Sequence, residues 1–288
     1  MADEDKYPVE SDRRRFVKGV VGAAAVAGFG ASGAAAVNTS TPPSPVGGGV
    51  RNFMGTEMVD GPAPNGMPQI PLQVDDEGYL QGIWPETEEI EVDGETFVIA
   101  EEELGGIEYS SEWYHYCGGQ TLPGLAPTAD QENYFHYSEI TQYEWQQSDV
   151  EAGDRIHIDD FEDYMEWEPE EDIGSSQIGK PATATWRSEG DDIGSAETVN
   201  VFVLRSELIE EAAAGDDWLE ASTDEGFIAI FNTCTHFCCI PGWKVTRESM
   251  QFGTGDEIYC QCHQSVYDPF TIMEQSFVAL PREDEDDI

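Results

Sequence analysis

Short apolar runs separated by polar segments predict a series of β-strands in the C-terminal part of the chain. The segments 180–187 (KPATATWR), 198–205 (TVNVFVLR) and 226–232 (GFIAIFN) are rich in β-branched or aromatic residues, which favour strands. A further strand is predicted at 257–260 (EIYC), and another earlier in the chain at 95–100 (ETFVIA). The pattern therefore predicts a mostly β protein.

One short helix is predicted between two of these strands, at 206–215 (SELIEEAAAG). Ser206 is suited to cap its N-terminus, and Gly215 is suited to end it. Three apolar residues share one face of this helix: Leu208, Ile209 and Ala212.

The N-terminus has the pattern of an export signal. Residues 12–18 (DRRRFVK) match a twin-arginine motif, with Arg13 and Arg14 as the arginine pair. The uncharged residues 19–37 follow, and as a helix they would be roughly 28 Å long, close to the thickness of a hydrocarbon core. We expect a single membrane helix with its N-terminus inside, either retained as an anchor or cleaved near Ala34–Ala36.

Changes in composition predict five segments along the chain. They are a signal or membrane anchor at 1–37, a flexible Pro- and Gly-rich linker at 38–50, an acidic, aromatic-rich extension of unknown role at 51–177, a strand-rich domain at 178–282 and an acidic tail at 283–288. His115, Cys117 and His136 lie in the extension without a close ligand pair at a usual spacing, so we expect them to have packing roles.

The charge of the chain is strongly negative. It has 59 acidic residues against 13 Lys and Arg, a net charge of −46, and the acids are spread along its length. Such a surface repels nucleic acid, so that class of partner is excluded. At about 1 M salt the Debye length falls to roughly 3 Å and the self-repulsion is screened. We expect a protein adapted to high salt; an acidic docking face for a basic partner is the alternative.

Five of the six cysteines fall in two short motifs, CTHFCC at 234–239 and CQCH at 260–263, each directly after a predicted strand. A tetrahedral zinc site would need two Cys and two His, and would leave one further Cys of each motif unused. A redox dithiol would need C-x-x-C beside a βαβ unit, and a catalytic thiol would need a separate His and acid. A two-iron cluster together with a disulfide would use Cys and His from both motifs.

The two motifs resemble those of the Rieske iron–sulfur proteins, which read C-T-H-x-G-C and C-P-C-H-G-S-x-Y. The resemblance covers about residues 180–282. It implies a Rieske-type antiparallel β-sandwich head with a cluster-binding subdomain and one [2Fe–2S] cluster, whose two irons carry two Cys and two His ligands.

Matched by position, the resemblance assigns roles to eight residues of this chain. It implies Cys234 and Cys260 as ligands of the buried iron, His236 and His263 as ligands of the outer iron, a disulfide between Cys239 and Cys262, and hydroxyl donors to the cluster sulfurs at Ser265 and Tyr267. Such donors stabilise the reduced state and raise the potential.

Three residues depart from the family motifs. Cys238 and Gln264 stand where the family has Gly, and Gln261 stands where it has Pro. Cys238 adds a thiol that could compete for the disulfide, but the spacing favours Cys239. We expect Cys238 and Cys117 to be free thiols, with a bond between them as the alternative.

Within the family, the disulfide cysteines, the hydroxyl donors, the anchor and the linker favour the iron–sulfur subunit of a membrane quinol-oxidising cytochrome bc-type complex. This implies a redox subunit without stand-alone catalysis, with its head on the extracytoplasmic side of the cell membrane. The implied partners are a cytochrome b-type subunit, quinol, and a cytochrome c or blue copper acceptor. His263 would accept a hydrogen bond and a proton from quinol, and His236 would also titrate.

Two other classes of Rieske protein are alternatives to this assignment. A Rieske oxygenase lacks the disulfide pair and needs a mononuclear iron site with two His and a carboxylate, and no such His pair is recognisable outside the two motifs. An exported Rieske electron carrier, or the small subunit of another oxidoreductase such as a molybdenum oxidase, stays open as the alternative. A twin-arginine signal fits either, because a cluster inserted in the cytoplasm requires export of a folded protein.

Overall fold

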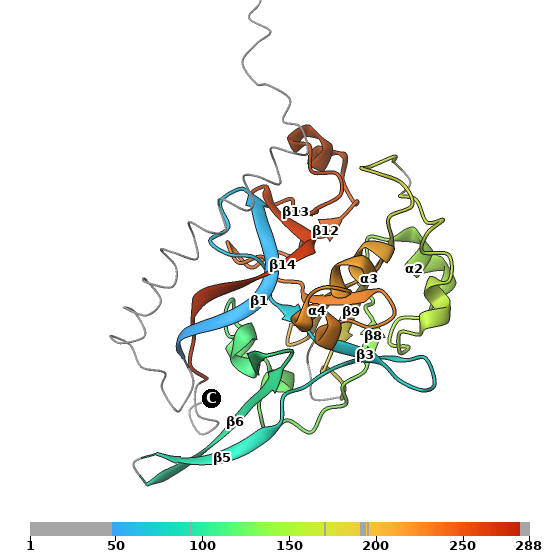
Figure 1. The fold of residues 1–288 in the computed structure, drawn as a ribbon. Helices are drawn as coiled ribbons and strands as arrows, with labels where there is room; N and C mark the ends of the chain where they lie inside the picture. Colours follow the sequence, from blue (N-terminus) through green and yellow to red (C-terminus); the bar gives the residue numbers. More distant parts are fainter. Residues whose placement is uncertain (1–47, 93, 170, 191–193, 195, 283–288) are drawn as a thin grey trace, which may run out of the picture. The chain divides into compact units, whose positions relative to one another are not determined.

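The computed structural model describes residues 48–92, 94–169, 171–190, 194 and 196–282 (Figure 1). These residues belong to one compact unit, Ser44–Ile288. The predicted anchor at 1–37, the linker up to residue 47 and the acidic tail at 283–288 lie outside the described residues. Among the helices that the structure does describe, none has the length and apolar character needed to cross a membrane.

The structure confirms a mostly β fold built from antiparallel sheets. The first main sheet has the order β1 (Gly49–Asp60), β14 (Ser265–Ala279), β13 (Ile258–Cys260) and β12 (Gly242–Trp243). The second has the order β2 (Gln69–Ile70), β11 (Phe227–Phe231), β10 (Val199–Arg205), β9 (Lys180–Trp186) and β8 (Phe135–Tyr137).

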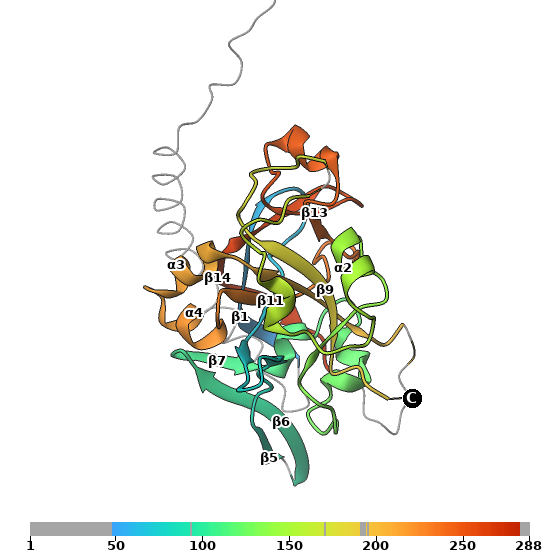
Figure 2. The ribbon, with the colours of Figure 1, turned by 90° about the vertical axis from the view of Figure 1, so that its right-hand side faces the viewer.

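Two smaller sheets and several short helices complete the described fold (Figure 2). The small sheets are β3 (Leu72–Val74) with β4 (Leu80–Gly82), and β5 (Thr87–Val92) with β6 (Glu95–Leu104) and β7 (Ile107–Ser110). The α-helices are α2 (Glu144–Asp149), α3 (Glu207–Ala213) and α4 (Asp217–Ser222). The 3₁₀ helices are η1 (Ser111–Tyr114), η2 (Gly119–Thr121), η3 (Pro123–Leu125), η4 (Ile158–Phe161) and η5 (Arg247–Phe252).

The strands predicted from apolar runs are present as β6, β9, β10, β11 and β13. The predicted helix is α3, and its N-terminus is capped as expected, because the side chain of Ser206 accepts the backbone N–H of Leu208. The helix ends at Ala213, before Gly215. Ile209 is buried, whereas Leu208 is 39% exposed, so the apolar face is narrower than predicted.

The extension at 51–177 and the domain at 178–282 share their sheets. β1 pairs with β14 along almost its whole length, and β2 pairs with β11 (Figure 1). The predicted boundary near 178 therefore does not separate two compact units. The reason is that β1 contains Gly, Arg and Asn and has little local strand signal; its conformation depends on pairing with a strand more than 200 residues away in sequence.

The buried residues form two hydrophobic clusters. The larger contains the aromatic side chains of the extension, among them Trp113 and Tyr114, packed with Trp186 and Phe231. The smaller contains Trp243, Ile258 and Tyr267, together with Cys234 and Cys260. Two of the six cysteines therefore lie inside a core, whereas the histidines that follow them in the two motifs do not.

Candidate metal centre

Two loops carry the candidate ligands. Loop 1, residues 232–241, joins β11 to β12, and loop 2, residues 261–264, joins β13 to β14. Loop 2 closes a tight hairpin in which Cys260 pairs with Ser265 and the Gln264 N–H donates to the Cys260 carbonyl oxygen at 2.9 Å. Local backbone bonding therefore fixes the shape of loop 2.

Loop 1 is longer and folds back on itself. The Cys234 N–H donates to the Cys239 carbonyl oxygen at 2.8 Å, and the Cys238 N–H donates to the Cys234 carbonyl oxygen at 2.9 Å. Cys238 has a φ of 59° and Gln264 a φ of 66°, both in the left-handed region. These are the two positions where the Rieske motifs have glycine, the residue that adopts this conformation at no steric cost. The loops therefore keep a glycine-type backbone without the glycines.

Gly61, at the end of β1, lies against loop 2. A Cβ at this position would come within 2.5 Å of the Gln264 carbonyl oxygen, and the φ of Gly61 is +100°. Only glycine allows this close approach without strain. The extension thus supports loop 2 directly, a contact for which the sequence alone carries no signal.

Cys234 and Cys260 form a buried pair of thiols. Neither is disulfide-bonded, and each is 1% exposed. A hydrogen bond from Cys260 is the largest cause that lowers the pKa of Cys234 below its usual value, and the Tyr267 hydroxyl, 3.0 Å from the Cys234 sulfur, lowers it further. The same pairing and burial raise the pKa of Cys260. The pair therefore holds one sulfur ready as a thiolate, the form that binds metals.

His236 and His263 lie together at the solvent-facing end of the two loops. Their ring centroids are 4.8 Å apart, with the rings nearly perpendicular. His263 is exposed and His236 is partly buried, and Phe237, 65% exposed, contacts both rings. The candidate ligands are thus divided into a buried sulfur pair and an outer nitrogen pair.

Seven buried side-chain polar atoms have no hydrogen-bond partner among the described residues, and two of them belong to candidate site residues: His236 Nδ1 and Ser265 Oγ. Ser265 is fully buried. An unsatisfied buried hydroxyl is costly and uncommon in native proteins. Both atoms are therefore suited to a group that is not part of the chain, a metal for the nitrogen and an acceptor such as a sulfide for the hydroxyl.

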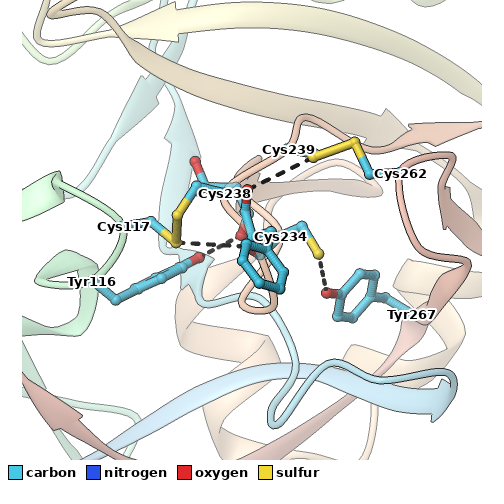
Figure 3. Close-up of a disulfide and its surroundings, with 9 residues drawn as sticks. Tyr116, Cys117, Cys234, Cys238, Cys239, Cys262 and Tyr267 are labelled. Carbon is cyan, nitrogen blue, oxygen red and sulfur yellow. Dashed lines mark hydrogen bonds between the residues drawn. A yellow bond between two sulfur atoms is a disulfide. The ribbon is translucent and has the colours of Figure 1, made fainter.

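The structure contains two disulfides, both at loop 1 (Figure 3). Cys239 is bonded to Cys262, the pair that the resemblance implies, with their Cα atoms 6.7 Å apart. Cys238 is bonded to Cys117, with a Cα–Cα distance of 5.4 Å. The expectation that Cys117 and Cys238 are free thiols is wrong. Chain folding brings together residues 121 positions apart, which no local pattern reveals.

The sulfurs of Cys239, Cys260 and Cys262 lie within 4.8 Å of one another. Two of these three atoms belong to a disulfide, so only Cys260 can offer a thiolate while that bond is intact. No four Cys, His, Asp or Glu donor atoms in the described part of the chain lie that close together.

The histidines of the extension have other environments. The His136 ring bonds to Glu132 at 2.7 Å and to the Gly153 carbonyl oxygen at 2.8 Å. His115 is buried, and its pKa is lowered to about 4 chiefly by burial and then by the charge of Arg282. Gln261, the third departure from the motifs, is exposed at the tip of loop 2.

Tyr116 is a residue of the site that the sequence does not reveal. Its hydroxyl donates to the Thr233 carbonyl oxygen at 2.7 Å, at the start of loop 1. In the sequence it is one of several aromatic residues in the extension, and nothing distinguishes it from those that only pack.

No family model matches the chain, and no curated protein or solved structure was found to be similar to it. The assignment of a function therefore depends on the two motifs and on the geometry of the site.

Proposed function

We propose that this chain is the Rieske-type [2Fe–2S] subunit of a membrane quinol-oxidising cytochrome bc-type complex. The observation that carries the proposal is the divided ligand set. It consists of a buried thiol pair, Cys234 and Cys260, and an outer imidazole pair, His236 and His263, on two loops joined by the Cys239–Cys262 disulfide.

The residues present fit the cluster. Cys234 and Cys260 would hold the inner iron, and His236, through its unpartnered Nδ1, and His263 would hold the outer iron. When bound, the cluster supplies one-electron transfer. Neutral imidazoles in place of two thiolates make the reduced state less unfavourable, so the ligand set favours a raised potential.

Two hydroxyl groups would raise the potential further. The Tyr267 hydroxyl lies 3.0 Å from the Cys234 sulfur, and the Ser265 hydroxyl is buried with its hydrogen-bonding capacity unused. Donors aimed at ligand and bridging sulfurs stabilise the additional negative charge of the reduced state. This combination favours a high-potential centre over a low-potential carrier.

The exposed edge of the site would meet the quinol. The His263 ring is exposed, and it would accept a hydrogen bond and then a proton from the quinol hydroxyl as the quinol gives up one electron. The cytochrome b subunit would take the second electron. The linker at 38–50 would let the head reach a cytochrome c or blue copper acceptor, with the anchor at 1–37 in the membrane and the head outside.

Metal analysis and low-temperature EPR of the full chain in high salt test the proposal, followed by a redox titration at several pH values. We expect iron and sulfide in equal amounts, a Rieske-type signal and a positive midpoint potential that falls with rising pH. His263→Gln should abolish the signal, and His157→Gln, on a partly exposed His of the extension, should leave it unchanged. Zinc without iron would overturn the family assignment, and a negative, pH-independent potential would favour the exported carrier.

A further inference from the structure

Loop 1 is held covalently from two sides at neighbouring residues. Cys239 is joined to Cys262 of loop 2, and Cys238 is joined to Cys117, which lies between η1 and η2 in the extension. Figure 3 shows the two disulfides leaving loop 1 in different directions, with Cys234 and Tyr267 beside them. Cys238 is two residues after the candidate ligand His236 and next to Cys239, so this part of the loop has little freedom.

The extension side of this arrangement is fixed in the larger core. Tyr114 is fully buried and packs edge-to-face on Phe231, with ring centroids 5.4 Å apart. Phe231 is the last residue of β11, directly before loop 1. The next aromatic residue, Tyr116, packs on Phe231 at 5.4 Å and donates its hydroxyl to the Thr233 carbonyl oxygen. The segment that carries Cys117 is therefore held firmly against the core.

The two disulfides therefore connect loop 1 to different parts of the protein. Cys239–Cys262 joins loop 1 to loop 2 and so ties it to the β13–β14 hairpin. Cys117–Cys238 joins loop 1 to a core segment, and the Cys117 sulfur lies 3.6 Å from the carbonyl oxygen of the ligand residue Cys234. Loop 2 needs no such anchor, because its hairpin is closed by backbone hydrogen bonds.

We propose that the Cys117–Cys238 disulfide and the Tyr116 hydroxyl form an anchor that fixes the His236 side of the metal centre to the protein body, independently of the Cys239–Cys262 disulfide. Its link to a cluster rests on the proposed function. Cys117, Cys238 and Tyr116 are positioning residues, since they act on the candidate ligands through the backbone of loop 1.

The test compares four full-length proteins in high salt: the wild type, C117S/C238S, C239S/C262S and the variant with all four substitutions. The measurement is the rate of iron loss to a chelator, with the EPR line width as a second readout. We expect C239S/C262S to retain its iron. Adding C117S/C238S should weaken iron binding about 10- to 100-fold, the usual loss of metal affinity when groups that orient the ligands are removed, and accelerate iron loss accordingly. Adding Tyr116→Phe instead should give a smaller acceleration.

The anchor is wrong if C117S/C238S leaves the rate and the line width unchanged in both backgrounds. It is also wrong if C239S/C262S alone loses iron as fast as the fourfold variant. Unfolding curves recorded beside these rates identify any variant that loses iron only because it no longer folds. Tyr116→Phe in the C239S/C262S background, which keeps the Cys117–Cys238 disulfide, then decides the question.

Hydrogen exchange on the metal-free proteins separates this inference from the proposed function. The Cys234 and Cys238 amides are bonded within loop 1 at 2.8 Å and 2.9 Å. The anchor predicts faster exchange of these amides in C117S/C238S than in C239S/C262S, by a larger factor than for the β10 amides, which report the change in global stability. If the wild type binds no iron but shows this order, the proposed function fails and the anchor stands. If iron is bound and the order is absent, the anchor fails alone.

Discussion

The two disulfides begin at neighbouring residues of loop 1 but close very different lengths of chain. Cys239–Cys262 spans 23 residues and joins the two motifs, whereas Cys117–Cys238 spans 121 residues and reaches into the extension. The first belongs to the candidate centre itself. The second joins the extension, which the sequence presents as an addition of unknown role, covalently to the loop that carries two of the candidate ligands.

The largest predicted difference between the two disulfides is in their contribution to the free energy of unfolding. In the chain-entropy model a longer closed loop restrains the unfolded chain more, so removing Cys117–Cys238 should cost about 5 kcal/mol and removing Cys239–Cys262 about 3 kcal/mol. Because Cys238 and Cys239 are adjacent, the fourfold variant measures how strongly the two disulfides are coupled. Denaturant unfolding of the C117S/C238S and C239S/C262S pairs at constant high salt, followed by Trp fluorescence, measures both. Equal costs, or the reverse order, would contradict the assignment of the long disulfide as the stronger restraint.

The same contrast explains what could be predicted from the sequence. β9, β10 and β11 could be predicted because each is a short run of β-branched and aromatic residues that is buried in the fold. The Cys239–Cys262 bond could be anticipated from the resemblance, because both residues lie inside the recognised motifs. In each case the prediction depends on short, local sequence patterns.

What could not be predicted depends on contacts between distant segments. β1 and β14 are long, and β14 contains Pro269 and many half-exposed residues, so neither has a clear strand pattern before the two pair. Cys117 has no partner within its own segment, and Tyr116 is one aromatic residue among many. Only the fold brings these residues to loop 1, through register and packing that no local propensity encodes.

The second prediction concerns the pH dependence of stability near Cys117, where the long disulfide begins. His115 is two residues from Cys117, and burial, with smaller contributions from Arg282 and Arg51, lowers its pKa from 6.5 to about 4. The unfolded chain therefore binds this proton more readily than the folded protein. The contribution of His115 to stability is complete above about pH 6.5 and is lost as the pH falls towards 4, by about 3 kcal/mol in total.

His115→Leu should remove this part of the pH dependence. The measurement is the unfolding free energy at pH 7 and pH 4.5 in high salt, compared as a difference between variant and wild type, so that the shared titration of the many carboxylates cancels. His157→Gln serves as the matched control and should keep the wild-type difference. A His115→Leu variant with the same loss of stability as the wild type would show that another group accounts for it.

The smallest predicted effect is on the midpoint potential, and it compares two tyrosine hydroxyls that contact loop 1 from different sides. The Tyr267 hydroxyl lies 3.0 Å from the Cys234 sulfur, and the Tyr116 hydroxyl donates to the Thr233 carbonyl oxygen. Burial and the bond to Cys234 raise the pKa of Tyr267, so its hydroxyl keeps its proton and remains a donor. If Cys234 is a cluster ligand, Tyr267→Phe removes a hydrogen bond that favours the reduced state. The acceptor sulfur is charged in both redox states, so only the difference in bond strength between them counts. A difference of about 1 kcal/mol would lower the midpoint potential by about 40 mV.

Tyr116→Phe removes a hydroxyl of the same kind from the same loop, but its acceptor is a backbone carbonyl and not a ligand sulfur. It should therefore change the midpoint potential much less than Tyr267→Phe, while it accelerates iron loss in the C239S/C262S background. Redox titrations of both variants at one pH compare the two side by side. Equal shifts would mean that Tyr267 acts only by holding loop 1 in place, and the distinction between tuning the ligand and anchoring the loop would fail.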